Sequence, residues 1–359
     1  MRKNWGITIS ILLAIAAWAS CGGGGNSSSS SHVLYITVPD SNGVSAFRIN
    51  SSGQLTSVLG SPFPVGTSPH TIVGHPSGKF LYVANQSEDS ISLLKIDSRS
   101  GAVAESLPRT PTGDSPSSLA MDSGGTLLFV SNQISSTISV YSIDSGAGTL
   151  TQVAGSPFLA HLNPSALLLS ASGSLLYVAY PNLDRVSVYS VGSGGALQEI
   201  AGSPFPVGHG PAALATDSSA KFLFVANSSD NTLSVMAINS STGALTQVSG
   251  SPFVTGTTPI SLLVGPTGVL YVADLGSSDI RAFSIDVTTG ALTQITNSPF
   301  STDSNPTFLT MDSGGKLLLV ASQGVKTVLE FKIDASSGQL TRSNSVTLGS
   351  APAAVFSAR

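Results

Sequence analysis

The chain has very little charge and almost no cysteine. Only 9% of its 359 residues are Asp, Glu, Lys or Arg, whereas a soluble domain usually has about 25%. The hydrophobic share is an ordinary 41%, so apolar residues have not replaced the missing charge. Serine has replaced it, with 64 copies, together with 37 glycines.

These shortages argue against three classes of protein. A formal net charge of -4 leaves no basic excess for neutralising phosphates, so we expect no nucleic-acid partner. A single cysteine, Cys21, excludes an internal disulfide framework. Leu, Val, Ile and Phe recur throughout the chain, which argues against general disorder.

The first 31 residues predict an export signal and a tether. Basic residues precede an apolar run over 5–19, which is shorter than the ~20 residues that span a bilayer. Residues 18–21, Trp-Ala-Ser-Cys, resemble the lipobox of bacterial lipoproteins, in which the cysteine carries the lipid. We therefore expect a signal peptide over 1–20 and a Gly/Ser tether over 21–31, with Cys21 attached to a bacterial membrane in the periplasm or at the cell surface.

The rest of the chain, residues 32–359, repeats one unit seven times. A strand of the type Tyr-Val-Ala-Asn begins at 35, 82, 129, 177, 224, 271 and 319, so successive copies lie 47 or 48 residues apart. A proline recurs at 69, 116, 164, 211, 259, 306 and 352 with nearly the same spacing. A Ser-Pro-Phe triplet begins at Ser61, Ser156, Ser203, Ser251 and Ser298. Three markers with one period establish an internal repeat.

Each repeat predicts four short strands, named here a to d. In the second repeat, strand a covers 71–75, Gly78 closes a tight turn, strand b covers 80–84 and strand c covers 91–96. A weaker strand d follows. Four strands per unit at this period predict an all-β fold, namely a seven-bladed β-propeller of four-stranded antiparallel blades.

The two ends of the repeat region predict how the ring closes. The first repeat starts at strand b with residues 32–38, and the last one ends with a strand a over 352–357. Together these fragments complete one blade, and a closed ring leaves no exposed sheet edge. We therefore expect the C-terminal strand a to pair with the N-terminal strands b to d, in a monomer.

The Tyr-Val-Ala-Asn-like strands, the proline-led strands and turns such as Pro76-Ser77-Gly78-Lys79 resemble the lactonase-type seven-bladed propellers. That family includes YVTN-repeat surface proteins, 6-phosphogluconolactonases and carboxymuconate cyclases. Its enzymatic branch carries Pro-Arg-His at the start of strand a and a Glu after the Asn that ends strand b. The nearest counterparts here are Pro69-His70-Thr71 and Gln86. The resemblance therefore implies the fold and leaves open whether this chain is an enzyme.

Candidate site residues lie in the d–a and b–c loops, at one mouth of the central channel. Lactone opening needs a base for water and a cation or donor for the oxyanion. The candidate catalytic residues are His70, Arg185 and Arg281. The candidate ligand-binding residues are His161, His209, Asp279 and Asp303.

Three of these candidates are histidines from different repeats, which could meet on a metal ion. No short-spaced pair of ligands accompanies His70, His161 or His209, so the sequence predicts no metal and no cofactor.

Arg281 is the clearest exception to the repeat, because other repeats have Ser92, Ser139, Ser187 and Ser234 at its position. The pattern favours a local ion pair with Asp279 or Asp184 over a fork that binds a ligand carboxylate. Arg185 and Arg281 are the only arginines that the pattern places near this mouth.

Two functions remain open. The first is a non-catalytic module on the cell envelope that binds a protein, a glycan or a small molecule at the channel mouth. Export favours this function, because 6-phosphogluconate metabolism is cytosolic. The alternative is a 6-phosphogluconolactonase-like lactone hydrolase that acts outside the cytoplasm, with Arg185, Arg281 and the loop histidines in its site.

Overall fold

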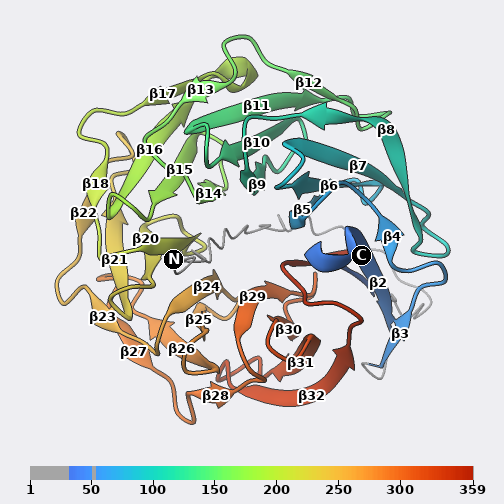
Figure 1. Ribbon diagram of the computed structural model, residues 1–359. Helices are drawn as coiled ribbons and strands as arrows, with labels where there is room; N and C mark the ends of the chain where they lie inside the picture. The colour runs from blue at the N-terminus through green and yellow to red at the C-terminus, as the bar shows by residue number, and fades with distance from the viewer. Residues whose placement is uncertain (1–31, 51–53, 359) are drawn as a thin grey trace, which may run out of the picture.

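Each repeat folds into one antiparallel sheet, and seven such sheets surround a central axis as the blades of a propeller (Figure 1). This computed structural model describes residues 32–50 and 54–358. The predicted signal peptide, the tether and Cys21 lie outside the described residues. The all-β class and the seven four-stranded blades are confirmed.

The innermost strand of every blade is strand a, and the outermost is strand d. Blade 1 contains β1 (His32–Val38), β2 (Gly43–Ile49), β3 (Leu55–Ser57), β4 (Phe63–Pro64) and β33 (Val355–Ala358). Blade 2 contains β5 (Pro69–Gly74), β6 (Phe80–Asn85), β7 (Ser90–Ile96) and β8 (Val103–Pro111). Blade 3 contains β9 (Pro116–Met121), β10 (Leu127–Asn132), β11 (Thr137–Ile143), β12 (Leu150–Gln152) and β13 (Phe158–Leu159). Blade 4 contains β14 (Ala166–Leu169), β15 (Leu175–Tyr180), β16 (Arg185–Val191), β17 (Leu197–Glu199) and β18 (Phe205–Pro206).

The remaining blades follow the same order. Blade 5 contains β19 (Pro211–Thr216), β20 (Phe222–Asn227), β21 (Thr232–Ile238), β22 (Leu245–Gln247) and β23 (Phe253–Val254). Blade 6 contains β24 (Pro259–Val264), β25 (Val269–Asp274), β26 (Asp279–Ile285), β27 (Leu292–Gln294) and β28 (Phe300–Ser301). Blade 7 contains β29 (Pro306–Met311), β30 (Leu317–Ser322), β31 (Thr327–Ile333) and β32 (Leu340–Thr347). Two short 3-10 turns, η1 (Pro39–Ser41) and η2 (Ser193–Gly195), are the helical segments of the described chain, and none there could span a membrane.

The Ser-Pro-Phe triplet interrupts the outermost strand of five blades. In blade 1 it separates β3 from β4, and the Ser61 hydroxyl accepts the backbone N–H of Ala46 on strand c at 2.9 Å. The same bond recurs with Ser156, Ser203, Ser251 and Ser298. The hydroxyl therefore replaces the backbone acceptor that the interruption removes.

Hydroxyl groups also join the innermost strands of neighbouring blades. Ser118 accepts the N–H of Leu167 at 3.1 Å, and Ser261 accepts the N–H of Leu309 at 2.9 Å. Both serines are completely buried. Part of the serine excess thus satisfies backbone groups at the crowded centre of the ring, where a small side chain with a polar atom is needed.

The tyrosine that opens the Tyr-Val-Ala-Asn motif connects adjacent blades. Its hydroxyl donates to the carbonyl of a glycine in the c–d turn of the next blade, in the pairs Tyr35–Gly101, Tyr82–Gly148 and Tyr271–Gly338. Burial raises the pKa of each of these tyrosines, so each remains a protonated donor.

The C-terminal strand closes the ring as predicted. β33 pairs with β1, and the Thr37 backbone exchanges two 3.0 Å hydrogen bonds with Ala353 and Ala354. The Phe356 ring lies against Gly74 on β5, where an added Cβ would come within 2.2 Å of it. The two ends of the chain therefore meet in blade 1.

Candidate functional site

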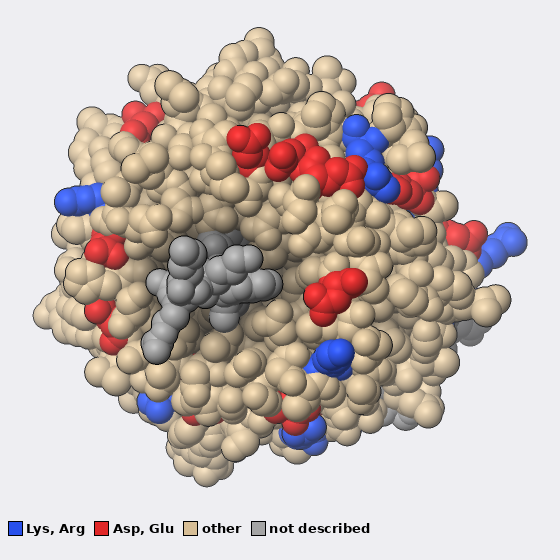
Figure 2. All heavy atoms as spheres, in the orientation of Figure 1, with Lys and Arg blue, Asp and Glu red and all other residues tan. Residues whose placement is uncertain are grey.

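The b–c and d–a loops form one face of the propeller, called the loop face below (Figure 2). The loops of this face contain many residues with positive φ, a conformation that Asn, Asp and Gly adopt most readily. One such residue ends each b–c loop, and another precedes most strands a. In several blades the side chain of the first accepts the N–H of the second in the next blade, in the pairs Asn42–Ser68, Asp89–Ser115, Asp184–Gly210 and Asn231–Thr258.

The three histidine candidates lie apart and have different partners. His161 Nε2 lies 3.2 Å from Glu199 Oε1, and His209 Nδ1 lies 2.7 Å from Asp184 Oδ2. The bond to Asp184 raises the pKa of His209. His70 is on the inner strand β5, where burial lowers its pKa to about 4 and keeps it neutral at pH 7. Across residues 32–50 and 54–358, no three His, Cys, Asp or Glu residues are grouped as metal ligands.

Two arginines that were not predicted from the sequence also reach the loop face. Arg109 on β8 binds both carboxylate oxygens of Glu105 at 2.7 and 2.9 Å, and it binds Glu88 at 2.9 Å. Arg342 on β32 binds Asp303, one of the four predicted ligand-binding residues, at 2.9 Å.

The sequence placed only Arg185 and Arg281 near the mouth, and Arg109 and Arg342 are two further arginines that reach the loop face from outermost strands. A signal for the other two existed: Arg109 and Arg342 lie on the outer strands of blades 2 and 7, the two blades without a Ser-Pro-Phe triplet. Arg185 itself donates to the carbonyl oxygen of Pro204 at 3.3 Å.

Blades 2, 3 and 5 share a neutral hydrogen-bond network at the end of strand b. In blade 2 the Asn85 amide donates to the hydroxyls of Ser90 and Ser92 at 3.1 and 2.9 Å. The same bonds join Asn132 to Thr137 and Ser139, and Asn227 to Thr232 and Ser234. An amide with two hydroxyls thus occupies this position in three of the seven blades.

Blade 6 replaces all three members of this network with charged residues, which we call the blade 6 cluster: Asp274, Asp279 and Arg281. Arg281 Nε lies 3.9 Å from Asp274 Oδ2 and 4.0 Å from Asp279 Oδ1. The predicted ion pair with Asp279 is therefore present, whereas the contact with Asp274 was missed. Asp274 is completely buried and accepts a 3.1 Å hydrogen bond from the Thr255 hydroxyl.

The blade 6 cluster is the most unusual electrostatic environment on the loop face. Burial raises the pKa of Asp274 to about 7, and the charge of Asp279 acts in the same direction. Asp279 Oδ1 and Arg281 Nε are buried and make no hydrogen bond. Their side chains are 14% and 26% exposed. This arrangement holds a carboxyl group that exchanges a proton near neutral pH beside a guanidinium.

Another buried carboxyl group lies in blade 7, away from the loop face. Glu330 on β31 is completely buried and accepts a 2.7 Å hydrogen bond from the Ser343 hydroxyl. Burial raises its pKa. Lacking exposure, it cannot contact a ligand directly.

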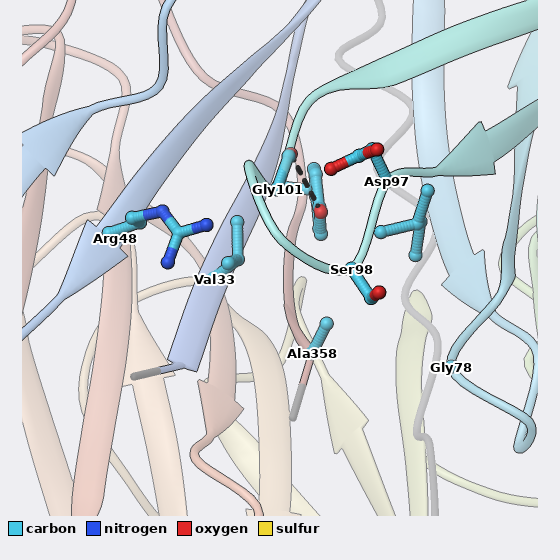
Figure 3. Close-up of a pocket in the computed structure, with 9 residues that line it drawn as sticks. Val33, Arg48, Gly78, Asp97, Ser98, Gly101 and Ala358 are labelled. Carbon is cyan, nitrogen blue, oxygen red and sulfur yellow. Dashed lines mark hydrogen bonds between the residues drawn. The ribbon is translucent and has the colours of Figure 1, made fainter. Parts of the chain in front are cut away.

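The opposite face has a small cavity of about 50 Å³ between blades 1 and 2 (Figure 3). Arg48 beside it binds the carbonyl oxygens of Arg99 and Ser100, and Tyr35 binds that of Gly101. One water molecule needs about 10–15 Å³ of such space, so the cavity has room for a few water molecules. These contacts connect the two blades.

Known proteins resemble the chain over nearly its whole length. The family model described as Lactonase, 7-bladed beta-propeller, matches residues 26–161, 153–264 and 261–356. A search among curated proteins finds none that matches. A candidate 6-phosphogluconolactonase from Bacteroides fragilis has 19% identity and a TM-score of 0.80, with 94% of this chain and 100% of that chain covered. The periplasmic gluconolactonase of Pseudomonas aeruginosa has 19% identity and a TM-score of 0.79, with 92% and 99% covered.

A third structure shows that this architecture is also found with other chemistry. Virginiamycin B lyase from Staphylococcus aureus has 17% identity and a TM-score of 0.55, with 78% of this chain and 84% of that chain covered. At such identities the solved structures support the fold alone. The family model covers most of the sequence, and the chain therefore belongs to the lactonase family of seven-bladed β-propellers.

Proposed function

We propose that the protein hydrolyses a lactone at its loop face, with the blade 6 cluster as the reacting group. Family membership supports the reaction class, and two of the similar structures are described as lactonases. The observation that carries the proposal is the replacement of a neutral Asn-Ser-Ser network by Asp274, Asp279 and Arg281. Blades 2, 3 and 5 form the same strands around a neutral network, so the fold itself does not require a charged cluster at this position.

The cluster contains the groups that lactone hydrolysis needs. The Asp279 carboxylate accepts a proton from water, and the resulting hydroxide adds to the carbonyl carbon of the lactone. Arg281 stabilises the oxyanion that forms on the carbonyl oxygen. The intermediate then collapses, the ring C–O bond breaks, and the proton passes from Asp279 to the leaving oxygen. Asp274 lies behind both groups and acts as a positioning residue for Arg281.

This proposal is tested by hydrolysis of a panel of γ- and δ-lactones by the full-length protein. The Arg281→Ala variant is expected to lower kcat/KM by about 100-fold, as the loss of an oxyanion donor does elsewhere. Arg342→Ala is the matched control, because it removes another ion pair from the same face. We expect it to leave kcat/KM within about twofold. Failure of the wild-type protein to hydrolyse any lactone would reject the proposed activity.

A second candidate is the non-catalytic binding module, with a protein, glycan or small-molecule partner at the mouth. Two properties of the inner strands favour it. Their hydroxyl groups form hydrogen bonds between blades, and their sequences match no Arg-His-Glu signature. The same panel separates the two functions. A module that only binds leaves every lactone intact.

We also propose that the protein is exported and attached to a bacterial membrane through Cys21. The support is the sequence of residues 1–31 alone. Cys21→Ala is expected to move the protein from the membrane fraction to the soluble fraction and to abolish labelling by a palmitate analogue. Cys21→Ala protein that stays in the membrane fraction would contradict lipid attachment.

A further inference from the structure

We infer that the lactone is an uncharged polyhydroxy compound and that the loop face excludes phosphorylated lactones. The inference rests on the proposed function and concerns the substrate class of the same site. Three observations carry it: the distribution of charge between the two faces, the partners of the basic side chains, and the partners of the loop N–H groups.

Acidic residues outnumber basic ones on the loop face. Nine of them lie in its loops or at the strand ends beside them: Asp40, Glu88, Asp89, Asp114, Asp184, Asp230, Asp274, Asp279 and Asp303. Five basic side chains reach the same face: Arg109, Arg185, Arg281, Lys326 and Arg342. Figure 2 shows acidic side chains spread around the centre of this face.

The opposite face is balanced among the described residues. Its a–b and c–d turns contain seven aspartates, each bonded to N–H groups of its own turn: Asp97, Asp122, Asp144, Asp217, Asp286, Asp312 and Asp334. Seven basic residues lie in or beside those turns: Arg48, Lys79, Lys95, Arg99, Lys221, Lys316 and Lys332. The acidic excess therefore belongs to the face on which we place the reaction.

Most basic groups of the loop face are already bound by the protein. Arg109 is bound by two carboxylates, Arg342 lies on Asp303, and Arg281 lies between Asp274 and Asp279. Recognition of a phosphate dianion requires several converging cations or N–H donors. Arg185 and Lys326 are exposed, but they belong to blades 4 and 7 and do not converge on one phosphate.

The loop N–H groups that could bind an anion are occupied as well. Turns with positive φ commonly bind phosphate through successive N–H groups. Here Glu88 accepts the N–H of Thr67, Asp89 that of Ser115, and Asp230 that of His209. The protein's own carboxylates thus fill the positions that a phosphate would need. Those carboxylates are acceptors for the hydroxyl groups of a neutral sugar lactone.

The test compares D-glucono-δ-lactone with its 6-phosphate as substrates of the full-length protein at low and high salt. We expect kcat/KM at least tenfold higher for the neutral lactone at low salt, with a smaller difference at high salt because salt screens the repulsion. Equal or faster hydrolysis of the phosphorylated lactone would overturn the inference while leaving the proposed function intact.

A pair of variants isolates the charge of the loop face. Asp40→Asn with Asp114→Asn removes two exposed acids that the proposed reaction does not use. We expect it to raise kcat/KM for the phosphorylated lactone about three- to tenfold at low salt and to leave the neutral lactone unchanged. Ser145→Lys with Ser240→Lys changes the charge equally on exposed turns of the opposite face and serves as the control. Equal effects of the two pairs would contradict a local origin.

Binding separates this inference from the proposed function if neither lactone is hydrolysed. D-Glucono-δ-lactam and its 6-phosphate are then titrated calorimetrically into the wild-type protein. If the protein binds the neutral lactam and not its 6-phosphate, the inference holds for a ligand that is bound without being hydrolysed. Binding of the phosphorylated lactam, or of neither compound, overturns it.

Discussion

Deletion of residues 355–359 is expected to lower the melting temperature by about 7 °C. The deletion removes β33, which supplies the innermost strand of blade 1 and the pairing between the two ends of the chain. Val355 is 2% exposed and Ala358 is 6% exposed, so the loss exposes the adjoining core of blades 1, 2 and 7. Burial of such side chains and the strand pairing together contribute about 5 kcal/mol, which corresponds to this shift. Calorimetry of the full-length and shortened proteins measures it.

A point variant tests the same closure if the shortened protein fails to fold. Gly74→Ala places a methyl group against the Phe356 ring and is expected to destabilise the protein by about 1–3 kcal/mol. Phe356→Ala in the same molecule should recover part of that loss, since it removes the collision. Gly349→Ala is the matched control, because nothing lies within 4 Å of an added Cβ there. Additive effects at Gly74 and Phe356 would contradict a contact between them.

Restoring the repeat in blade 6 is expected to abolish activity and keep the fold. The triple variant Asp274→Asn, Asp279→Ser, Arg281→Ser reproduces the network of Asn85, Ser90 and Ser92. We expect kcat/KM for lactones to fall by at least about 100-fold, because both the base and the oxyanion cation are lost. Circular dichroism and the melting temperature report whether the blade remains folded. A triple variant with wild-type kcat/KM would exclude the blade 6 cluster as the reacting group.

The pH dependence of stability provides an independent readout for this variant. The folded-state pKa of Asp274, about 7, exceeds its ordinary value of 3.8. The contribution of Asp274 to the free energy of unfolding is therefore fully present below about pH 4 and is lost as the pH rises through about 7. The triple variant lacks this titration, so its melting temperature should rise relative to wild type between pH 5 and pH 8. A constant difference over that range would contradict the raised pKa.

The fold and the closure of the ring could be predicted because they follow from a strand pattern that recurs along the chain and is incomplete at both ends. Residues 80–84 were expected as strand b and form β6 over Phe80–Asn85, while 32–38 coincide with β1. The expected strand a over 352–357 is observed as β33 over Val355–Ala358. Strand boundaries moved by a few residues only, because alternation and turn residues determine register locally.

The partners of the candidate site residues could not be predicted in this way. Arg342 meets Asp303 from 39 positions away, and Asp184 accepts the N–H of Gly210 from 26 positions away. Such contacts join one blade or loop to the next. A long side chain can reach several neighbours there, and the sequence pattern does not show which one it binds. The sequence did mark Arg281 as an exception, but its contact with Asp274 depends on which side chains face one another across β25 and β26.

The sequence by itself determined the ring of seven blades, the strand that closes it and the small number of charged residues that are available for chemistry. A repeat determines these features because each blade buries the same positions against its neighbours. Only the tertiary structure decided where the few charges meet: it buried Asp274 beside Arg281, bound Arg109 and Arg342 to carboxylates, and left the acidic excess on one face. Those outcomes depend on burial and distance between different strands, which a one-dimensional period does not contain.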